Sequence, residues 1–144
     1  MNKKTFTFLL IFLFFPIFLF YSCSSPQSTE PLQRAEIDVD VDVQHITFKQ
    51  VGDSLCADFT VIISETNGVG GRVSTLRIQI FSEDTLCVSY QFSGGNFQAN
   101  GTLEIDCSDI CVDPTCDYDK MEIRAEGTDD NAFKFNSFIS IDLS

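Results

Sequence analysis

Apolar and polar residues alternate along most of the chain after residue 35, which is the pattern of half-buried β-strands. The two clearest runs lie at 55–63 and 76–80, where the apolar residues share one parity. Between them, the segment 65–71 is rich in Gly and contains Asn, residue types that tolerate the positive φ angles of a chain reversal. The pattern predicts two strands joined by a reversal at the centre of a β-sandwich.

The region before this pair contains another strict alternation, at 36–43. Its polar positions are all acidic from Asp38 to Asp42, so we expect a first strand with an acidic outer face. The apolar parity then shifts to Ile46 and Phe48, which predicts a bulge or a change of sheet.

Shorter alternations after residue 82 predict the remaining strands, at 88–92, 103–105, 120–126 and 133–143. The segment 107–119 is rich in turn formers and acids, so we expect it to be irregular. No helix-period segment or repeat occurs outside the N-terminal segment. These features predict an all-β fold, an antiparallel β-sandwich of seven or eight strands.

The N-terminal segment has the features of an export signal. Two lysines precede the uncharged apolar run 6–21, and Ser22 and Cys23 follow it. The segment 19–23 resembles the lipobox of bacterial lipoproteins, in which a small residue precedes a Cys that becomes the acylated N-terminus. The resemblance implies a signal peptide at 1–22, a lipid anchor on Cys23 and a bacterial envelope location, at the outer membrane or cell surface. A plainly cleaved signal and an uncleaved anchor are the alternatives.

The polar, Pro-containing segment 23–35 reads as a tether, and 36–144 as the folded domain. The pattern E-T-N-G-V-G-G at 65–71, together with D-D-N at 129–131, resembles immunoglobulin-like modules of bacterial surface proteins. The resemblance implies an immunoglobulin-like sandwich whose role is binding, adhesion or architecture.

The exported part is strongly acidic. All 21 acidic residues follow Cys23, against only seven Lys or Arg. Such a charge repels nucleic acid and anionic lipid, so we expect membrane contact through the lipid anchor only, no nucleic-acid partner, and a protein or glycan partner that the sequence does not name.

Six cysteines in an exported chain of 144 residues predict disulfides and an oxidising compartment. If Cys23 is acylated, five remain, so at least one is free or pairs between molecules. If the strands alternate in direction, all five lie at one pole, and the loops around 65–71, 93–100 and 127–132 lie at the other, beside the tether. We favour the disulfides Cys56–Cys87 and Cys107–Cys116 with Cys111 free. Other pairings stay open, as does a zinc site at Cys107, Cys111 and Cys116.

Clustered carboxylates are the main candidates for binding chemistry. Asp109, Asp113, Asp117 and Asp119 crowd one segment and suit a hard cation such as Ca²⁺. A solvated acidic loop that binds no cofactor is the competing interpretation. Asp129 and its neighbours are a second cation candidate or simple turn chemistry.

No nucleophile elbow, phosphate loop or zinc-protease motif is present in the sequence, so we expect a protein that is not an enzyme. A small hydrolase would need a cleft that holds two carboxylates. We therefore predict a lipid-anchored, non-catalytic binding, adhesion or architectural module. The alternative is an accessory domain that binds Ca²⁺ or carbohydrate through its Asp-rich loops.

Overall fold

Nine β-strands and no helix form the regular structure of residues 30–143, the part of the chain that the computed structural model describes. The strands are β1 (Ile37–Val41), β2 (Lys49–Val51), β3 (Ser54–Glu65), β4 (Gly71–Ser82), β5 (Thr85–Ser93), β6 (Asn96–Phe97), β7 (Thr102–Val112), β8 (Lys120–Asp129) and β9 (Lys134–Asp142). The signal segment and Cys23 lie outside the described residues. Within 30–143, no helix has the length and apolarity needed to cross a membrane.

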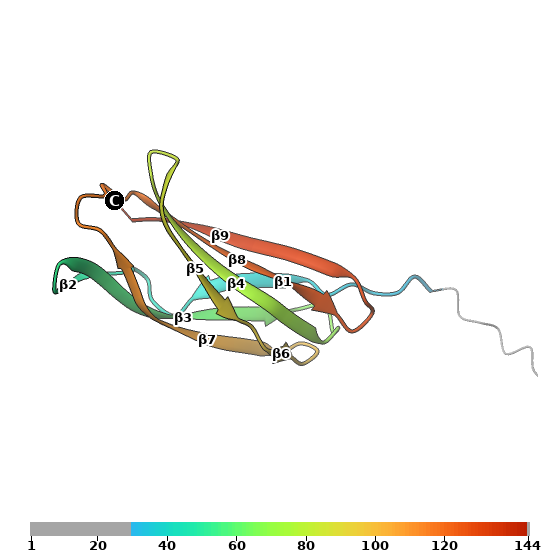
Figure 1. Cartoon of the computed structure of the whole chain (residues 1–144). Helices are drawn as coiled ribbons and strands as arrows, with labels where there is room; N and C mark the ends of the chain where they lie inside the picture. The colour runs from blue at the N-terminus through green and yellow to red at the C-terminus, as the bar shows by residue number, and fades with distance from the viewer. Residues whose placement is uncertain (1–29, 144) are drawn as a thin grey trace, which may run out of the picture. The chain divides into compact units, whose positions relative to one another are not determined.

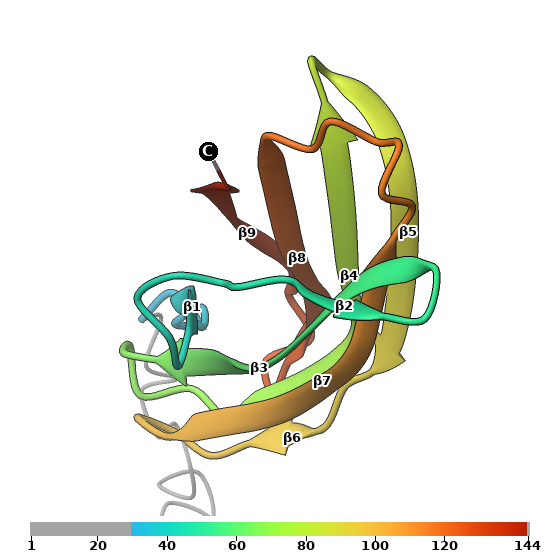
Figure 2. The same ribbon diagram turned by 90° about the vertical axis from the view of Figure 1, so that its left-hand side faces the viewer.

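The strands form two antiparallel sheets that pack face to face (Figures 1 and 2). In sheet A, β3 is central, with β1 and β2 along one side and β7 along the other. In sheet B the order is β5, β4, β8, β9, and the short β6 pairs with the end of β4. The predicted all-β architecture is confirmed. The count differs from seven or eight because β2 and β6, of 3 and 2 residues, follow no alternation of their own.

The core lies between the sheets and consists of the apolar residues that share one parity in each strand. Its fully buried side chains come from four strands: Val61 and Ile63 of β3; Leu76, Ile78 and Ile80 of β4; Ile110 of β7; and Met121 and Ile123 of β8. Each fully buried side chain of this size contributes about 1.5–3 kcal/mol relative to its exposed state. The alternation that predicted the strands is therefore the pattern of core contacts.

The sequence predicted that the segment 107–119 is irregular. This prediction was wrong for its first half, because β7 continues to Val112. A register shift between Ala57 and Phe59 interrupts the pairing of β3 with β7, and Asp109 has a φ of 56°. This irregularity lets Cys107 and Ile110 both face the core although they are three residues apart. The interrupted alternation concealed the end of the strand.

The parity shift after β1 marks an interruption rather than a change of sheet. The chain leaves sheet A after Val41 and returns to it at Lys49, and both β1 and β2 pair with β3. One long strand therefore supports two short ones on the same side.

The connections gather at two ends of the sandwich. The N-terminal pole contains residues 32–36 and the loops 66–70, 94–101 and 130–133, which are joined by hydrogen bonds. The opposite end, here called the cysteine pole, contains the β4–β5 turn and the connection 113–119. This separation of the loops agrees with the arrangement expected from alternating strand directions, but Cys107 lies within β7, opposite Phe59, and not at the cysteine pole as predicted.

Candidate functional site

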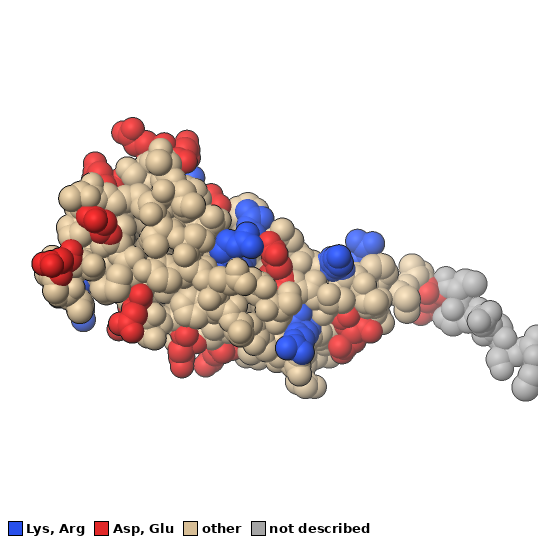
Figure 3. All heavy atoms as spheres, in the orientation of Figure 1, with Lys and Arg blue, Asp and Glu red and all other residues tan. Residues whose placement is uncertain are grey.

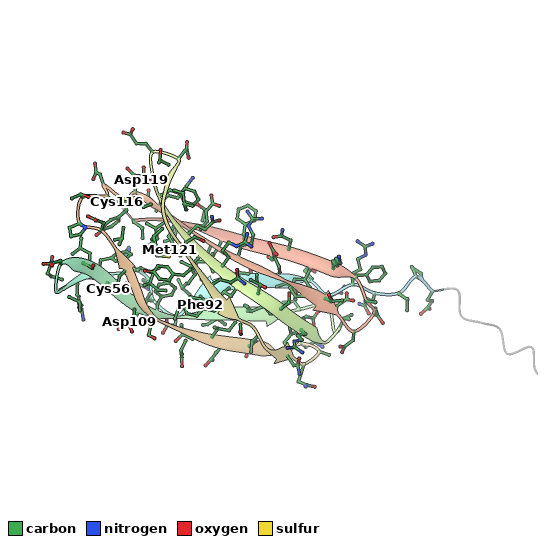
Figure 4. The ribbon with its side chains drawn as sticks, in the orientation of Figure 1. Cys56, Phe92, Asp109, Cys116, Asp119 and Met121 are labelled. Carbon is green, nitrogen blue, oxygen red and sulfur yellow. A yellow bond between two sulfur atoms is a disulfide. The ribbon has the colours of Figure 1, made fainter. Side chains whose placement is uncertain are left out.

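Two disulfides close the cysteine pole, with a pairing that differs from the predicted one. Cys56 is bonded to Cys111, and Cys87 to Cys116. The first bond joins two residues that face each other in the register of β3 with β7. The prediction that Cys111 is free was wrong because this residue lies in the extended β7 and not in a loop. Figure 4 shows Cys56 and Cys116 toward this end of the sandwich.

Cys107 is the free cysteine among the described residues, and the predicted bond Cys107–Cys116 does not exist. Its side chain is buried opposite Phe59, and its Sγ lies 3.5 Å from the carbonyl oxygen of Ile105. Burial, with a smaller contribution from the charge of Asp106, raises the pKa of this thiol to about 11. A thiol in this state is a poor nucleophile and a poor metal ligand. The two disulfides use Cys111 and Cys116, so these three cysteines do not form a zinc site.

The four predicted calcium ligands are not brought together. Asp109 lies in β7, where its backbone N–H donates to Asp58. Asp113 accepts hydrogen bonds from the backbone and hydroxyl of Thr115, which lower its pKa, and Asp119 accepts the backbone N–H of Glu83. Asp117 is exposed in the connection 113–119. Figure 4 shows Asp109 and Asp119 well apart. In residues 30–143, no three His, Cys, Asp or Glu side chains form a metal-binding group.

A hydroxyl group joins the two sheets near the disulfides. Tyr90 of β5 donates to the carbonyl oxygen of Cys111 at 2.7 Å, and its oxygen accepts the N–H of Cys111 at 3.0 Å. Both main-chain groups of one β7 residue are therefore satisfied by sheet B. This contact and the bond Cys87–Cys116 close the β5–β7 side of the sandwich.

The N-terminal pole is organised around a buried carboxylate, Glu65, which is 3% exposed. Its oxygens accept backbone N–H groups from residue 36, from residues 67–69 of the β3–β4 loop and from residue 100 of the β6–β7 loop. Burial alone would raise the pKa of Glu65, but four of these hydrogen bonds lower it, and the pKa lies below its ordinary value of 4.5. Glu65 holds three segments together in its ionised form.

Asp129 plays the same role for the neighbouring turn. Its Oδ1 accepts the backbone N–H groups of Asn131 and Phe133, and its Oδ2 accepts that of Ala35. Both oxygens are occupied by backbone donors, so the residue acts in the turn rather than as a ligand. The chain thus enters the sandwich between two buried carboxylates.

Basic residues gather on sheet B. Five of the seven that follow Cys23 lie there: Arg72, Arg77, Lys120, Arg124 and Lys134. Sheet A has acidic side chains on its exposed positions in β1 and β7, at Asp38, Asp40, Glu104 and Asp106. Figure 3 shows basic atoms over the β8–β9 region and acidic atoms along the side of β7.

The centre of the outer face of sheet B carries two arginines and an exposed ring. Arg77 and Arg124 face each other across β4 and β8, and Phe138 of β9 faces Arg124 on its other side. The Arg124 guanidinium lies 4.9 Å from the centre of the Phe138 ring, and its Nη1 donates to Asn136. The Phe138 ring is still 57% exposed.

Several hollows of the described domain are open to solvent. One of about 380 Å³ lies between the chain after β1 and the end of β9, lined by residues 40–44, Ile46 and 139–141. Another, of about 410 Å³, holds Asp119 and Asp142 beside Lys120, and Lys120 is already paired with Asp84 and Glu122.

Comparison with known proteins supports the fold alone. No family model matches the chain, and no curated protein matches its sequence. The structure is similar to a Bordetella pertussis protein provisionally named ApaA, with a TM-score of 0.56 and 16% identity over 77% of this chain and 96% of that one. It is also similar to the Northeast Structural Genomics Consortium target SoR45, with a TM-score of 0.53 and 14% identity over 78% of this chain and 85% of that one.

Sequence reasoning missed three structural features that define this surface and its poles. Glu65 belonged to the quoted pattern at 65–71, and an acid two residues before an Asn-Gly pair is a signal for carboxylate capping of loop N–H groups. The Tyr90 bridge has no sequence signal. The exposure of Phe138 could be read from its parity, which is opposite to that of Phe135 and Ile139.

Proposed function

We propose that this protein is a lipid-anchored module of a bacterial envelope, at the outer membrane or cell surface, that acts by binding, adhesion or architecture rather than by catalysis. The observation that carries the proposal is the place where the chain enters the sandwich. Residues 32–36 are fixed among the loops of the N-terminal pole, so an anchor on Cys23 would leave both outer faces and the cysteine pole accessible.

An immunoglobulin-like path is the finer description of the sandwich that we propose. The order β1, β3, β7 in one sheet and β4, β8, β9 in the other matches strands A, B, E and C, F, G of that fold. Strand β5 pairs with β4, as the C′ strand does in variable-type domains. Modules of this kind commonly expose flat faces and loop clusters for contact with partners.

The two disulfides indicate a compartment outside the cytoplasm, because thiols are kept reduced in the cytosol. Within residues 30–143, four cysteines form disulfides and Cys107 is buried. Acylation of Cys23, which lies outside the described residues, is part of the proposal and rests on the lipobox resemblance.

Membrane fractionation tests the proposal. The full chain is produced in a bacterial host as wild type, as Cys23→Ser and as the matched control Cys107→Ser. We expect wild type and the control in the membrane fraction, with an intact mass that includes a diacylglyceryl group. The Cys23→Ser chain should lose this modification. An unmodified wild-type chain, whether cleaved or not, would contradict the lipid anchor.

A further inference from the structure

The two sheets have four edges, and three of them are protected against pairing with another strand. Strand β1 has five residues and exposes Asp38 and Asp40, which discourages pairing. Strands β5 and β7 lie on the side closed by the Tyr90 hydrogen bonds, and β7 contains the irregularity at Asp109. Short, charged or distorted edges are the usual protection of native sheets.

The fourth edge, β9, has none of these protections between its ends. It runs for nine residues, 134–142, in continuous register with β8, without Pro or a bulge. Figure 2 shows β9 at the end of sheet B with no strand on its outer side. Strand β1 of the other sheet contacts it through the Ser137 hydroxyl, which donates to the Ile37 carbonyl oxygen, but the two strands do not pair. A regular edge of this length that pairs with no further strand is a template for another strand.

The sequence of β9 is complementary to itself when two copies run antiparallel. With Phe138 opposite its own copy, the outward side chains pair Asn136 with Ser140 and Lys134 with Asp142. The only two charges of the strand then meet their opposites at both ends, although Asp142 also lies opposite Lys120 within its own sheet. Opposite charges and aromatic pairs across strands each stabilise by about 0.2–1 kcal/mol.

Other registers lose this match. If the centre of the pairing moves by one residue, either Asn136 lies opposite Phe138 or Phe138 lies opposite Ser140. In both cases Lys134 and Asp142 of the two copies no longer face each other. A pairing that joins an outward residue to an inward one would turn the core side of β9 to solvent. The register centred on Phe138 is therefore the symmetric one that uses all nine residues.

The inward side of β9 favours the same arrangement. In this register Phe135 lies opposite Ile141 of the second copy, and Ser137 lies opposite Ile139. Ile139 and Ile141 line the open hollow of about 380 Å³ beside β9. A second copy would therefore place an aromatic ring at the rim of this hollow, near Ile139 and Ile141, although Asp40 and Asp42 also line it.

We propose that β9 is a homodimer edge, at which two copies of the chain join their B sheets through antiparallel β9 strands centred on Phe138. The outer face of the joined sheet then carries Phe138 of both copies between the two Arg124 guanidinium groups. This inference names a partner for the proposed binding module and rests on that function. The pairing of β9 strands needs no lipid anchor. Membrane fractionation can therefore contradict the lipid anchor without contradicting the dimer, and the cross-linking experiment below can contradict the dimer without contradicting the anchor.

Cysteine cross-linking in the full chain tests the register. Strand partners lie about 4.5–5.5 Å apart at Cα, within the range of a disulfide. We expect mild oxidation to give a covalent dimer of Phe138→Cys. Asn136→Cys and Ser140→Cys should each stay monomeric alone, because equal positions are then about 14 Å apart at 3.4 Å per residue. The two variants mixed should form a covalent heterodimer.

The matched control is Ser89→Cys, an exposed position on the outer face of β5 in the same sheet. It should stay monomeric under the same oxidation. Protection of Cys107 from alkylation reports that each variant is folded. The proposal is overturned if folded Phe138→Cys and the mixed pair give no dimer, if Ser89→Cys dimerises equally, or if Phe138→Cys couples to a different protein instead of to itself.

Discussion

At the scale of single residues, buried carboxylates fix the N-terminal pole. The carboxylate of Glu65 accepts N–H groups from three chain segments that are far apart in sequence, and each of these bonds is to a charged group. Such bonds are worth about 1.5–3 kcal/mol each when one partner is charged, and a buried donor left unpaired costs a similar amount. The loops therefore depend on one side chain.

Replacement of Glu65 by Gln should lower the free energy of unfolding by about 3 kcal/mol, because the amide group turns one acceptor into a donor facing N–H groups. Urea unfolding at pH 7 measures the change. Glu104→Gln is the matched control, since Glu104 is exposed on β7, and it should change stability by less than about 0.5 kcal/mol. Equal effects of the two substitutions would show that Glu65 does not organise the pole.

The difference between wild type and Glu65→Gln should depend on pH. Because the pKa of Glu65 is lower in the folded chain than its ordinary value of 4.5, its stabilisation is complete above that value. It is lost as the pH falls through the lower, folded pKa. Unfolding curves from pH 7 down to pH 2 should therefore converge for the two proteins at the acid end. A constant difference across this range would contradict an ionised, hydrogen-bonded Glu65.

Cys107 should resist alkylation in the folded chain. Its thiol is buried and its pKa is about 11, so little thiolate exists at pH 8 and the reagent has no access. Mass spectrometry without reductant should show no modified thiol in native buffer and one in denaturant. Proteolytic mapping should place that modification on Cys107. Modification of Cys111 instead would contradict the observed disulfides and support the predicted pairs Cys56–Cys87 and Cys107–Cys116.

At the scale of elements, Tyr90 connects two strands of different sheets. Tyr90→Phe removes the hydroxyl that pairs with both main-chain groups of Cys111, and should lower the free energy of unfolding by about 1–3 kcal/mol. Tyr118→Phe is the control, because Tyr118 packs its ring against Phe48 and has no hydroxyl hydrogen bond within the described part of the chain. Denaturant unfolding of both variants measures the difference, and equal losses would argue against the bridge.

Strands and core were largely predictable from the sequence because each side of a strand faces one environment. The parity of residues 55–63 and 76–80 matches the buried faces of β3 and β4. The rule failed at 107–112, where an irregularity in the β3–β7 pairing breaks the period of two. The disulfide pairing failed with it, since Cys111 was placed in a loop. Contacts between distant segments, such as those of Glu65 and Tyr90, produce no periodic pattern in the sequence and were therefore not predicted.

At the scale of the whole domain, the two sheets differ in the charge of their exposed residues and in the protection of their edge strands. The exposed positions of β1 and β7 are acidic, whereas most basic residues lie on sheet B, next to the unprotected β9. Two B sheets joined at β9 would continue the face that carries most of the basic residues. Asp40 and Asp42 of the chain around the end of β1 lie beside the end of β9, so some acidic repulsion acts at the junction.

Antiparallel pairing of β9 also determines where the two tethers begin. Lys134 lies next to the N-terminal pole, and in the dimer it faces Asp142 at the cysteine pole of the second copy. The two N-terminal poles then lie at opposite ends, separated by about 27 Å along a nine-residue strand. The eight residues 24–31, which precede the fixed segment 32–36, reach about 29 Å at most. In a dimer whose strands stand upright on one membrane, one tether would have to run back along its own domain, whereas an upright dimer between facing membranes has no such requirement.

Lipid-anchored copies should therefore pair between facing membranes. Cells that carry Asn136→Cys are mixed with cells that carry Ser140→Cys, and both are oxidised mildly. We expect the covalent heterodimer to form in the mixture and to disappear when β9 pairing is blocked by Phe138→Lys in both chains, which places two like charges at the centre. A heterodimer that forms only when one cell carries both variants would show pairing within one membrane, and the adhesive geometry would then be wrong.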